Sequence, residues 1–311
     1  MTQIKPWSQA AVRGALVALM FGSVMTVSAD VDLPTKFDNA RSISNTRHNL
    51  TQRQAAGGPV STTMDRFRND YGEVCVYCHT PHGSNANVVL PLWNRTIKAT
   101  TYNTYDQLGT STITQQVSQP GPNSLSCLSC HDGQVAVDSV INMPGAGGYL
   151  AAQATVQNNT FLNAWTNPSG IDATVHVGLD PVVANGCLSC HSAGAGINGT
   201  GATDFAAFVI GTDLRNDHPV GVRFPTPGPG VDFNTPGATR PGLRWFDNNG
   251  NNFPDPREVR LYDSGEGFEV ECASCHDPHG VPSAGVGSSF NPSFLRVSNA
   301  GSAVCLTCHT K

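Results

Sequence analysis

Five copies of one cysteine motif constrain this 311-residue chain more than any other feature. All 10 cysteines belong to Cys-x-x-Cys-His units. Two thiols at this spacing can add to the vinyl groups of one haem, and the adjacent histidine then reaches the iron. We therefore expect five covalently bound haems, attached through Cys75, Cys78, Cys127, Cys130, Cys187, Cys190, Cys272, Cys275, Cys305 and Cys308. The expected proximal iron ligands are His79, His131, His191, His276 and His309.

Structural zinc and disulfides are the competing explanations of the cysteines. Four-cysteine zinc sites need no histidine after every second cysteine, and five pairs cannot be divided evenly among them. Disulfides suit an exported protein. Neither disulfides nor thioredoxin-like redox pairs explain the histidine that follows each pair.

The remaining histidines match the number of haems. The chain has 10 histidines, of which five lie outside the motifs: His48, His82, His176, His218 and His279. After the first 29 residues only Met64 and Met143 remain as methionines, so thioether ligation cannot be general. We therefore expect these five histidines to be distal ligands, which makes every haem bis-histidine. Surface or hydrogen-bonded histidines are the ordinary alternative.

Bis-histidine iron has no vacant position for a substrate, which indicates electron transfer rather than catalysis. Two imidazoles also favour low reduction potentials. A pentahaem nitrite reductase is the enzyme alternative. That class keeps a site open with a lysine in place of a motif histidine, and no Cys-x-x-Cys-Lys occurs here.

Two of the motifs continue in the same way. Residues 75–83 read CVYCHTPHG and residues 272–280 read CASCHDPHG, so a second histidine, His82 or His279, follows the proximal one after three residues. Such a short segment cannot pass around the edge of a porphyrin. We therefore expect each second histidine to ligate a neighbouring haem and hold two haems close together.

Composition argues against an ordinary hydrophobic core. Charged residues are only 13% of the chain, with 32 glycines and 21 prolines. We expect mostly coil with short helices at the motifs and few short strands, wrapped around a chain of five covalently bound haems. Short strands are expected at 174–177 and in a hairpin of 258–262 with 268–271, turned by DSGEG.

Residues 1–29 resemble a secretory signal peptide. Lys5 and Arg13 precede the uncharged run GALVALMFGSVMTV, and Val27-Ser28-Ala29 ends the segment. An uncleaved anchor is the alternative, although the run is shorter than the about 20 residues that span a bilayer. We expect residues 30–311 to form one exported pentahaem domain without a membrane span. The net charge of -5 gives no basic surface for nucleic acid.

A weaker pattern lies at 247–258, DNNGNNFPDPRE. Asp247, Asn249, Asn251, Asp255 and Glu258 occupy positions of a calcium loop. Asn252 stands where such loops have glycine. Calcium and a solvated Asn-Gly turn are the two interpretations.

Several stretches carry a family resemblance: TRHNLT (46–51), CVYCHTPHGSN (75–85), PLWNR (91–95), SCLSCHDG (126–133), NDHPVG (216–221) and EVRLYDSGEGFEVECASCHDPHG (258–280). With these stretches the chain resembles the extracellular multihaem c-type cytochromes of the OmcE and OmcS type, which polymerise into conductive filaments. The resemblance implies a loop-dominated fold around an unbroken chain of bis-histidine haems. It also implies extracellular electron transfer, with other multihaem cytochromes or extracellular electron acceptors as partners.

The resemblance further implies that one axial histidine is donated to the next subunit of a homopolymer. His48, alone in the N-terminal arm, is the candidate donor. A soluble periplasmic pentahaem shuttle to a partner reductase is the alternative function, and the motifs do not separate it from a filament.

Overall fold

The computed structural model describes residues 38–51, 68, 71–86, 88–97, 100–142, 178–179, 186–189, 191–192, 205–226 and 228–311. The predicted signal peptide, the predicted strand 174–177, His176 and Cys190 lie outside the described residues.

The helices of the described residues are short, as expected. The α-helices are α2 (Pro122–His131), α4 (Cys272–Cys275) and α5 (Ala303–Cys308). The 3₁₀ turns are η1 (Ile43–Asn45), η3 (Cys75–Tyr77), η4 (Tyr105–Leu108), η7 (Cys187–Ser189), η9 (Ala206–Phe208), η10 (Leu214–Asn216), η11 (Pro292–Phe294) and η12 (Ala300–Ser302). Each of the five motifs thus forms a turn of helix. No helix in this part of the chain is both long and apolar enough to cross a membrane.

Local sequence explains where the motif helices begin. In α2, Pro122 stands in the first turn, where its missing N–H is not needed and its fixed φ suits the helix. In α4, the Glu271 and Ser274 side chains form a capping box with each other's backbone N–H groups. Because α4 has only four residues, this box holds a motif that would otherwise be too short to remain helical.

A small antiparallel sheet lies in the C-terminal half. Its strands are β1 (Val222–Arg223), β2 (Ala238–Arg240), β3 (Leu243–Trp245), β4 (Arg260–Asp263) and β5 (Phe268–Val270), in the order β1-β5-β4-β3-β2. The predicted hairpin is confirmed as β4 and β5, which pair Tyr262 with Glu269. Gly265 and Gly267 adopt φ values of 114° and 112° in its turn, which side chains with a Cβ rarely adopt. Strands β1, β2 and β3 were not predicted, because they are too short to show an alternating pattern.

The apolar core is divided into small clusters. One contains Tyr71, Val76, Tyr77 and Val140, another Phe224, Phe246, Val259 and Leu261. The others are Tyr102, Leu128 and Leu214, and Ala238, Leu243 and Trp245. Each cluster is far smaller than the single core of an ordinary domain. This division agrees with a fold whose motifs surround cofactors.

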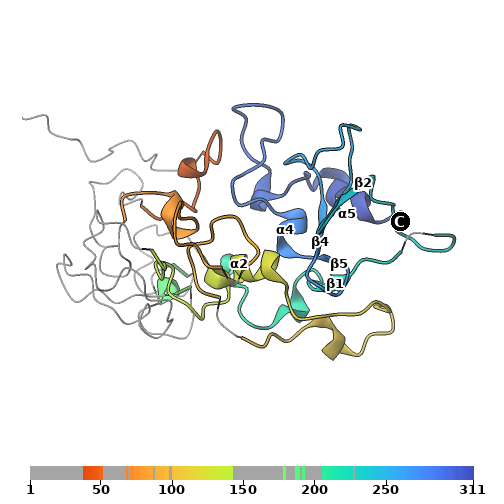
Figure 1. Cartoon of the computed structure of the whole chain (residues 1–311), viewed down its shortest axis with the longest axis horizontal. Helices are drawn as coiled ribbons and strands as arrows, with labels where there is room; N and C mark the ends of the chain where they lie inside the picture. Colours follow the sequence, from red (N-terminus) through yellow and green to blue (C-terminus); the bar gives the residue numbers. More distant parts are fainter. Residues whose placement is uncertain are drawn as a thin grey trace, which may run out of the picture.

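Figure 1 shows how these parts are arranged. The sheet, α4 and α5 lie together in the blue, C-terminal half, and α2 lies between them and the red and orange N-terminal segments. Helix α2 also contacts α4, so the second and fourth motifs are neighbours in space.

Candidate haem sites

Two segments hold their motif histidines in the same backbone register. We call residues 75–95 the first tether unit and residues 272–296 the second. In the first, His79 forms a β-bridge with Trp93, and in the second His276 forms one with Leu295. The backbone hydrogen bonds on either side of each bridge also correspond. In the first unit, Thr80 N–H donates to Leu92 O and Asn94 N–H donates to Cys78 O, both at 2.9 Å. In the second unit, Asp277 N–H donates to Phe294 O at 2.8 Å and Arg296 N–H donates to Cys275 O at 2.7 Å.

The same register fixes the imidazole rings. His79 donates from Nδ1 to Pro91 O at 2.9 Å, and His276 donates to Ser293 O at 2.7 Å. Both carbonyls lie two residues before the bridge partner. His131 likewise donates from Nδ1 to a backbone carbonyl, Phe208 O, at 2.6 Å. A backbone carbonyl on Nδ1 sets the tautomer and leaves Nε2 as a metal ligand. In these three motif histidines, Nε2 is therefore the nitrogen that can ligate iron.

Two predicted distal histidines lie opposite proximal ones. The His79 and His279 ring centres are 6.1 Å apart with planes at 13°, and those of His48 and His131 are 6.3 Å apart at 84°. Two imidazoles that share one metal at about 2 Å have ring centres roughly 6 Å apart, because each centre lies about 1.1 Å behind its bound nitrogen. Both centre-to-centre distances agree with one iron held between the two rings.

His48 lies against the second tether unit of its own chain, and its donation to another subunit stays a prediction. Its ring packs on Phe294 at 4.7 Å, and its Nδ1 lies 3.2 Å from Pro278 O of the same chain. Burial lowers the pKa of His48 to about 4, so the ring is neutral, the form that ligates a metal. The loop 46–50 folds back onto the second tether unit, which the sequence spacing did not indicate. In this chain the His48 ring therefore lies beside the ring of His131.

The other predicted ligands are less fully defined. His218 lies near His309 and His276, which both lower its pKa after the larger effect of burial. His82 is exposed at the end of its tether. The ring of His191 stacks on Phe205 at 4.0 Å, and that of His309 packs on Phe233 at 4.6 Å. His176 lies outside the described residues, so its prediction stays open.

The cysteines give the order of the motifs in space. Burial raises the pKa of Cys78 to about 12, and Cys130 of the second motif adds to this effect. Cys127 of the second motif and Cys272 of the fourth interact directly, thiol to thiol. Burial also raises the pKa of Cys308 to about 12, with Cys275 of the fourth motif adding to it. Among these four motifs the first therefore neighbours the second, the second neighbours the fourth, and the fourth neighbours the fifth.

The cysteine geometry disfavours the competing explanations. In the described part of the chain, the cysteines of the first, second, fourth and fifth motifs are free thiols. Nor does this part of the chain gather three or more cysteine, histidine or acidic side chains into a group that could hold a metal ion. Zinc needs such a group of thiolates, whereas haem attachment needs only the two thiols of one motif. The residues present therefore fit haem.

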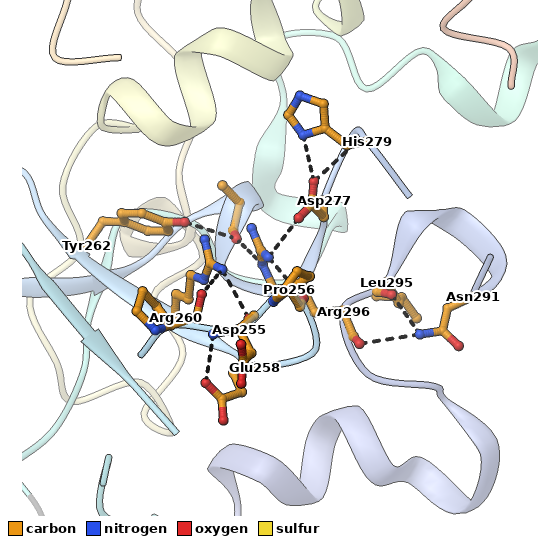
Figure 2. A network of polar contacts seen from close by, with 12 residues as sticks. Asp255, Pro256, Glu258, Arg260, Tyr262, Asp277, His279, Asn291, Leu295 and Arg296 are labelled. Atoms are coloured by element: carbon orange, nitrogen blue, oxygen red, sulfur yellow. Dashed lines mark hydrogen bonds and ion pairs between the residues drawn. The ribbon is translucent and has the colours of Figure 1, made fainter. Parts of the chain in front are cut away.

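Two buried arginines support the motifs. Arg95, fully buried, donates to the carbonyls of Ser129, Ala136 and Val137 at 2.7–2.9 Å and to Ser129 Oγ at 3.1 Å. It thereby joins the first tether unit to the second motif. Arg296 donates to Ala273 O and Pro256 O and pairs with Asp277 at 3.0 Å. Figure 2 shows this network, with Asp277 between Arg296 and His279.

The predicted calcium loop is joined by hydrogen bonds between its own residues. Asp247 accepts the N–H groups of Gly250 (2.7 Å) and Asn252 (2.9 Å), and the amides of Asn249 and Asn251 donate to Asp255 at 2.7 and 2.8 Å. Glu258, buried, accepts the N–H groups of Asn248 and Asp255. Asn252 adopts φ 60°, which replaces the glycine of such loops. These contacts fit the solvated Asn-Gly turn, and calcium binding stays a prediction.

Sequence reasoning missed the residues that orient the histidines. Pro91 and Ser293 act through backbone carbonyls, which carry no side-chain signal. The backbone register places SFLRV (293–297) in the position of PLWNR (91–95). The two stretches share no residue at equivalent positions, so the sequence carries no signal of their correspondence.

Residues 266–311 match a family model described as the doubled CXXCH motif. The matched segment contains the fourth and fifth motifs, which the cysteines place next to each other. No curated protein matches the chain significantly. The paired motif indicates covalently bound haem c and a multihaem c-type cytochrome that transfers electrons.

Proposed function

We propose that the chain carries electrons along five bis-histidine haems, each attached through one Cys-x-x-Cys-His motif. The observation that carries this proposal is that two pairs of imidazoles lie close together. The ring centres are 6.1 Å apart for His79 and His279 and 6.3 Å apart for His48 and His131. Each bound haem would supply one reversible one-electron carrier. The chain's part is to hold the rings, exclude other ligands and keep neighbouring motifs in contact.

Distal ligands follow from the same geometry. His279 of the second tether unit serves the haem of Cys75 and Cys78, and His48 serves the haem of Cys127 and Cys130. His218, near His309 and His276, serves the fourth or fifth motif. His82 and His176 remain for the other irons. Because His82 is exposed, it is available to an iron outside the described residues, including one of a neighbouring subunit.

We further propose an exported protein that polymerises into an extracellular filament. The leader-like residues 1–29 and the resemblance to filament-forming cytochromes support this proposal. The contacts between neighbouring motifs support a continuous electron path, because tunnelling between closely packed haems is fast. Few charged side chains, 13% of the chain, also reduce repulsion between copies.

Three measurements test these proposals: the intact mass and the carbon monoxide spectrum test the haems, and electron microscopy tests the filament. The intact mass of the mature protein should equal the chain without residues 1–29 plus five haems, and carbon monoxide should leave the reduced spectrum unchanged. A mass with fewer haems, or a spectrum shifted by carbon monoxide, would contradict the bis-histidine assignment. Electron microscopy of the secreted fraction should show filaments. Dispersed monomers confined to the periplasm would favour a soluble shuttle instead.

A further inference from the structure

The two tether units differ at the residue after the proximal histidine. The first unit has Thr80, whose Oγ1 donates to the carbonyl of His82 at 2.9 Å. The second unit has Asp277, whose Oδ1 accepts from Nδ1 of His279 at 2.9 Å and from its backbone N–H at 3.1 Å. A carboxylate therefore binds the ring of one tether histidine, at a position where the other unit has a neutral hydroxyl.

The carboxylate is held in place by buried groups. Its second oxygen pairs with Arg296 Nη1 at 3.0 Å, and the side chains of Asp277 and Arg296 are only 14% and 4% exposed. Arg296 is itself fixed by Ala273 O at 3.0 Å and Pro256 O at 3.1 Å. Figure 2 shows the chain of contacts from Arg296 through Asp277 to His279. The contact with His279 is thus one end of an ordered network.

The acceptor on Nδ1 affects how strongly an imidazole donates to a metal. A carboxylate is acceptor-only, so Nδ1 of His279 carries the proton and Nε2 is left for the iron. A charged acceptor polarises the ring more than a neutral one and raises the basicity of the ligand. His48 and His218 have backbone carbonyls near Nδ1 instead, Pro278 O and Pro219 O, both at 3.2 Å. Among these three histidines, only His279 has a carboxylate partner.

We propose that Asp277 is a positioning residue that acts through His279 and lowers the reduction potential of the haem held between His79 and His279. A more strongly donating imidazole stabilises ferric over ferrous iron, because the oxidised centre carries the larger positive charge. The inference rests on the proposed function, since it takes His279 as a distal iron ligand. It gives that haem a lower potential than an equivalent site with a carbonyl acceptor would have.

The test replaces Asp277 by the residue of the other unit. In Asp277→Thr, one of the five reduction potentials measured by spectroelectrochemistry should rise, with the equilibrium constant for reduction of that haem increasing roughly tenfold. The other four should move little. Rings at 13° and at 84° give different low-spin electron paramagnetic resonance signals, so a shift at the His79 and His279 haem can be distinguished from one at the His48 and His131 haem. Five unchanged potentials in a protein with five low-spin haems would overturn the inference.

A variant of Arg296 separates tuning from structural support. Arg296→Gln keeps the bond between Asp277 and His279 but removes the cation that offsets the carboxylate. The potential of the same haem should then fall, opposite in direction to Asp277→Thr. A merely structural network would move both variants in the same direction or leave the potential unchanged. If Asp277→Thr yields no holoprotein, the downward shift in Arg296→Gln remains required, and an upward shift or none would overturn the inference.

Thr80→Asp supplies the reciprocal test. It places a carboxylate two residues before His82 and should lower the potential of a second haem. A Thr80→Asn variant, similar in size and uncharged, is the control and should produce a smaller shift. An unchanged set of potentials in Thr80→Asp would count against the role assigned to the carboxylate. Fewer than five haems, or a high-spin iron in the wild-type protein, would instead contradict the proposed function.

Discussion

The first and second tether units bind their proximal histidines with the same backbone hydrogen bonds but surround them with different polar side chains. Residues Leu92 and Phe294, at equivalent positions, share positive φ values of 53° and 58°. Yet Thr80 corresponds to Asp277, and Val74, before the first motif, corresponds to Glu271 before the fourth. The comparison teaches that backbone register holds the ligands, whereas a few side chains set the local electrostatics.

The distal histidine gives the largest expected effect. His279→Ala should remove the sixth ligand of the haem attached at Cys75 and Cys78, although the mutation lies in the second unit. One of five haems should become high-spin and bind carbon monoxide, which electron paramagnetic resonance and absorption spectra would detect. His82→Ala is the matched variant and should affect a different haem. If both changes affected the same haem, the claim that His279 and His82 ligate different haems would be contradicted.

Replacing Arg95 or Arg296 should cost different amounts of stability, because the two buried arginines have different partners. Arg95→Met should lower the free energy of unfolding by about 5 kcal/mol, because three buried carbonyls lose their donor. Arg296→Met should cost less, since Asp277 keeps its bond to His279. Arg257→Met, at an exposed position, is the control and should cost under about 1 kcal/mol. Denaturant unfolding of the holoproteins measures all three, and equal losses for Arg95 and Arg257 would contradict this account.

In each tether unit the second histidine is followed by a glycine with positive φ, but the side chains around the two glycines differ. A Cβ on Gly280, at φ 86°, would lie 2.1 Å from the ring of Phe290. On Gly83, at φ 65°, it would lie 3.0 Å from the side-chain amide of Asn142, which can rotate away. Gly280→Ala should therefore cost about 4 kcal/mol and Gly83→Ala about 1 kcal/mol. Unfolding midpoints that fall equally would show that the two turns are packed alike.

The carboxyl before the fourth motif should make stability depend on pH. Burial raises the pKa of Glu271 to about 7, against contributions from Ser124 and Gly121 that lower it. Because the folded pKa exceeds the unfolded one, this stabilisation is complete below about pH 4.5 and is lost as the pH rises through about 7. Between pH 5 and pH 8 the loss should be up to about 3 kcal/mol.

Glu271→Gln should reduce this dependence, because the amide stays neutral at both pH values. Thermal unfolding of both proteins at pH 5 and pH 8 measures the difference. Glu266→Gln, which changes a carboxylate on the neighbouring turn of the hairpin, is the control and should leave the slope nearly as in the wild type. If the stability of Glu271→Gln depended on pH as steeply as that of the wild type, a group other than Glu271 would be the one that titrates.

The sequence predicted those parts of the molecule that depend on side-chain identity at fixed spacing. The motif helices and the hairpin of β4 and β5 were expected, since thiol spacing and the DSGEG turn are local signals. The place of His48 was not, because the loop 46–50 reaches Pro278 and Phe294 through long-range contacts. The carbonyls of Pro91 and Ser293 were also missed, because any residue can supply a carbonyl when the backbone register provides it.

A map of iron positions from electron cryo-microscopy of the mature protein tests the central claim most directly. The account predicts one iron between the imidazoles of His79 and His279, with the haem bonded to Cys75 and Cys78. Density in which His79 and His279 ligate two different irons, or in which the iron at His79 has no second histidine, would contradict it.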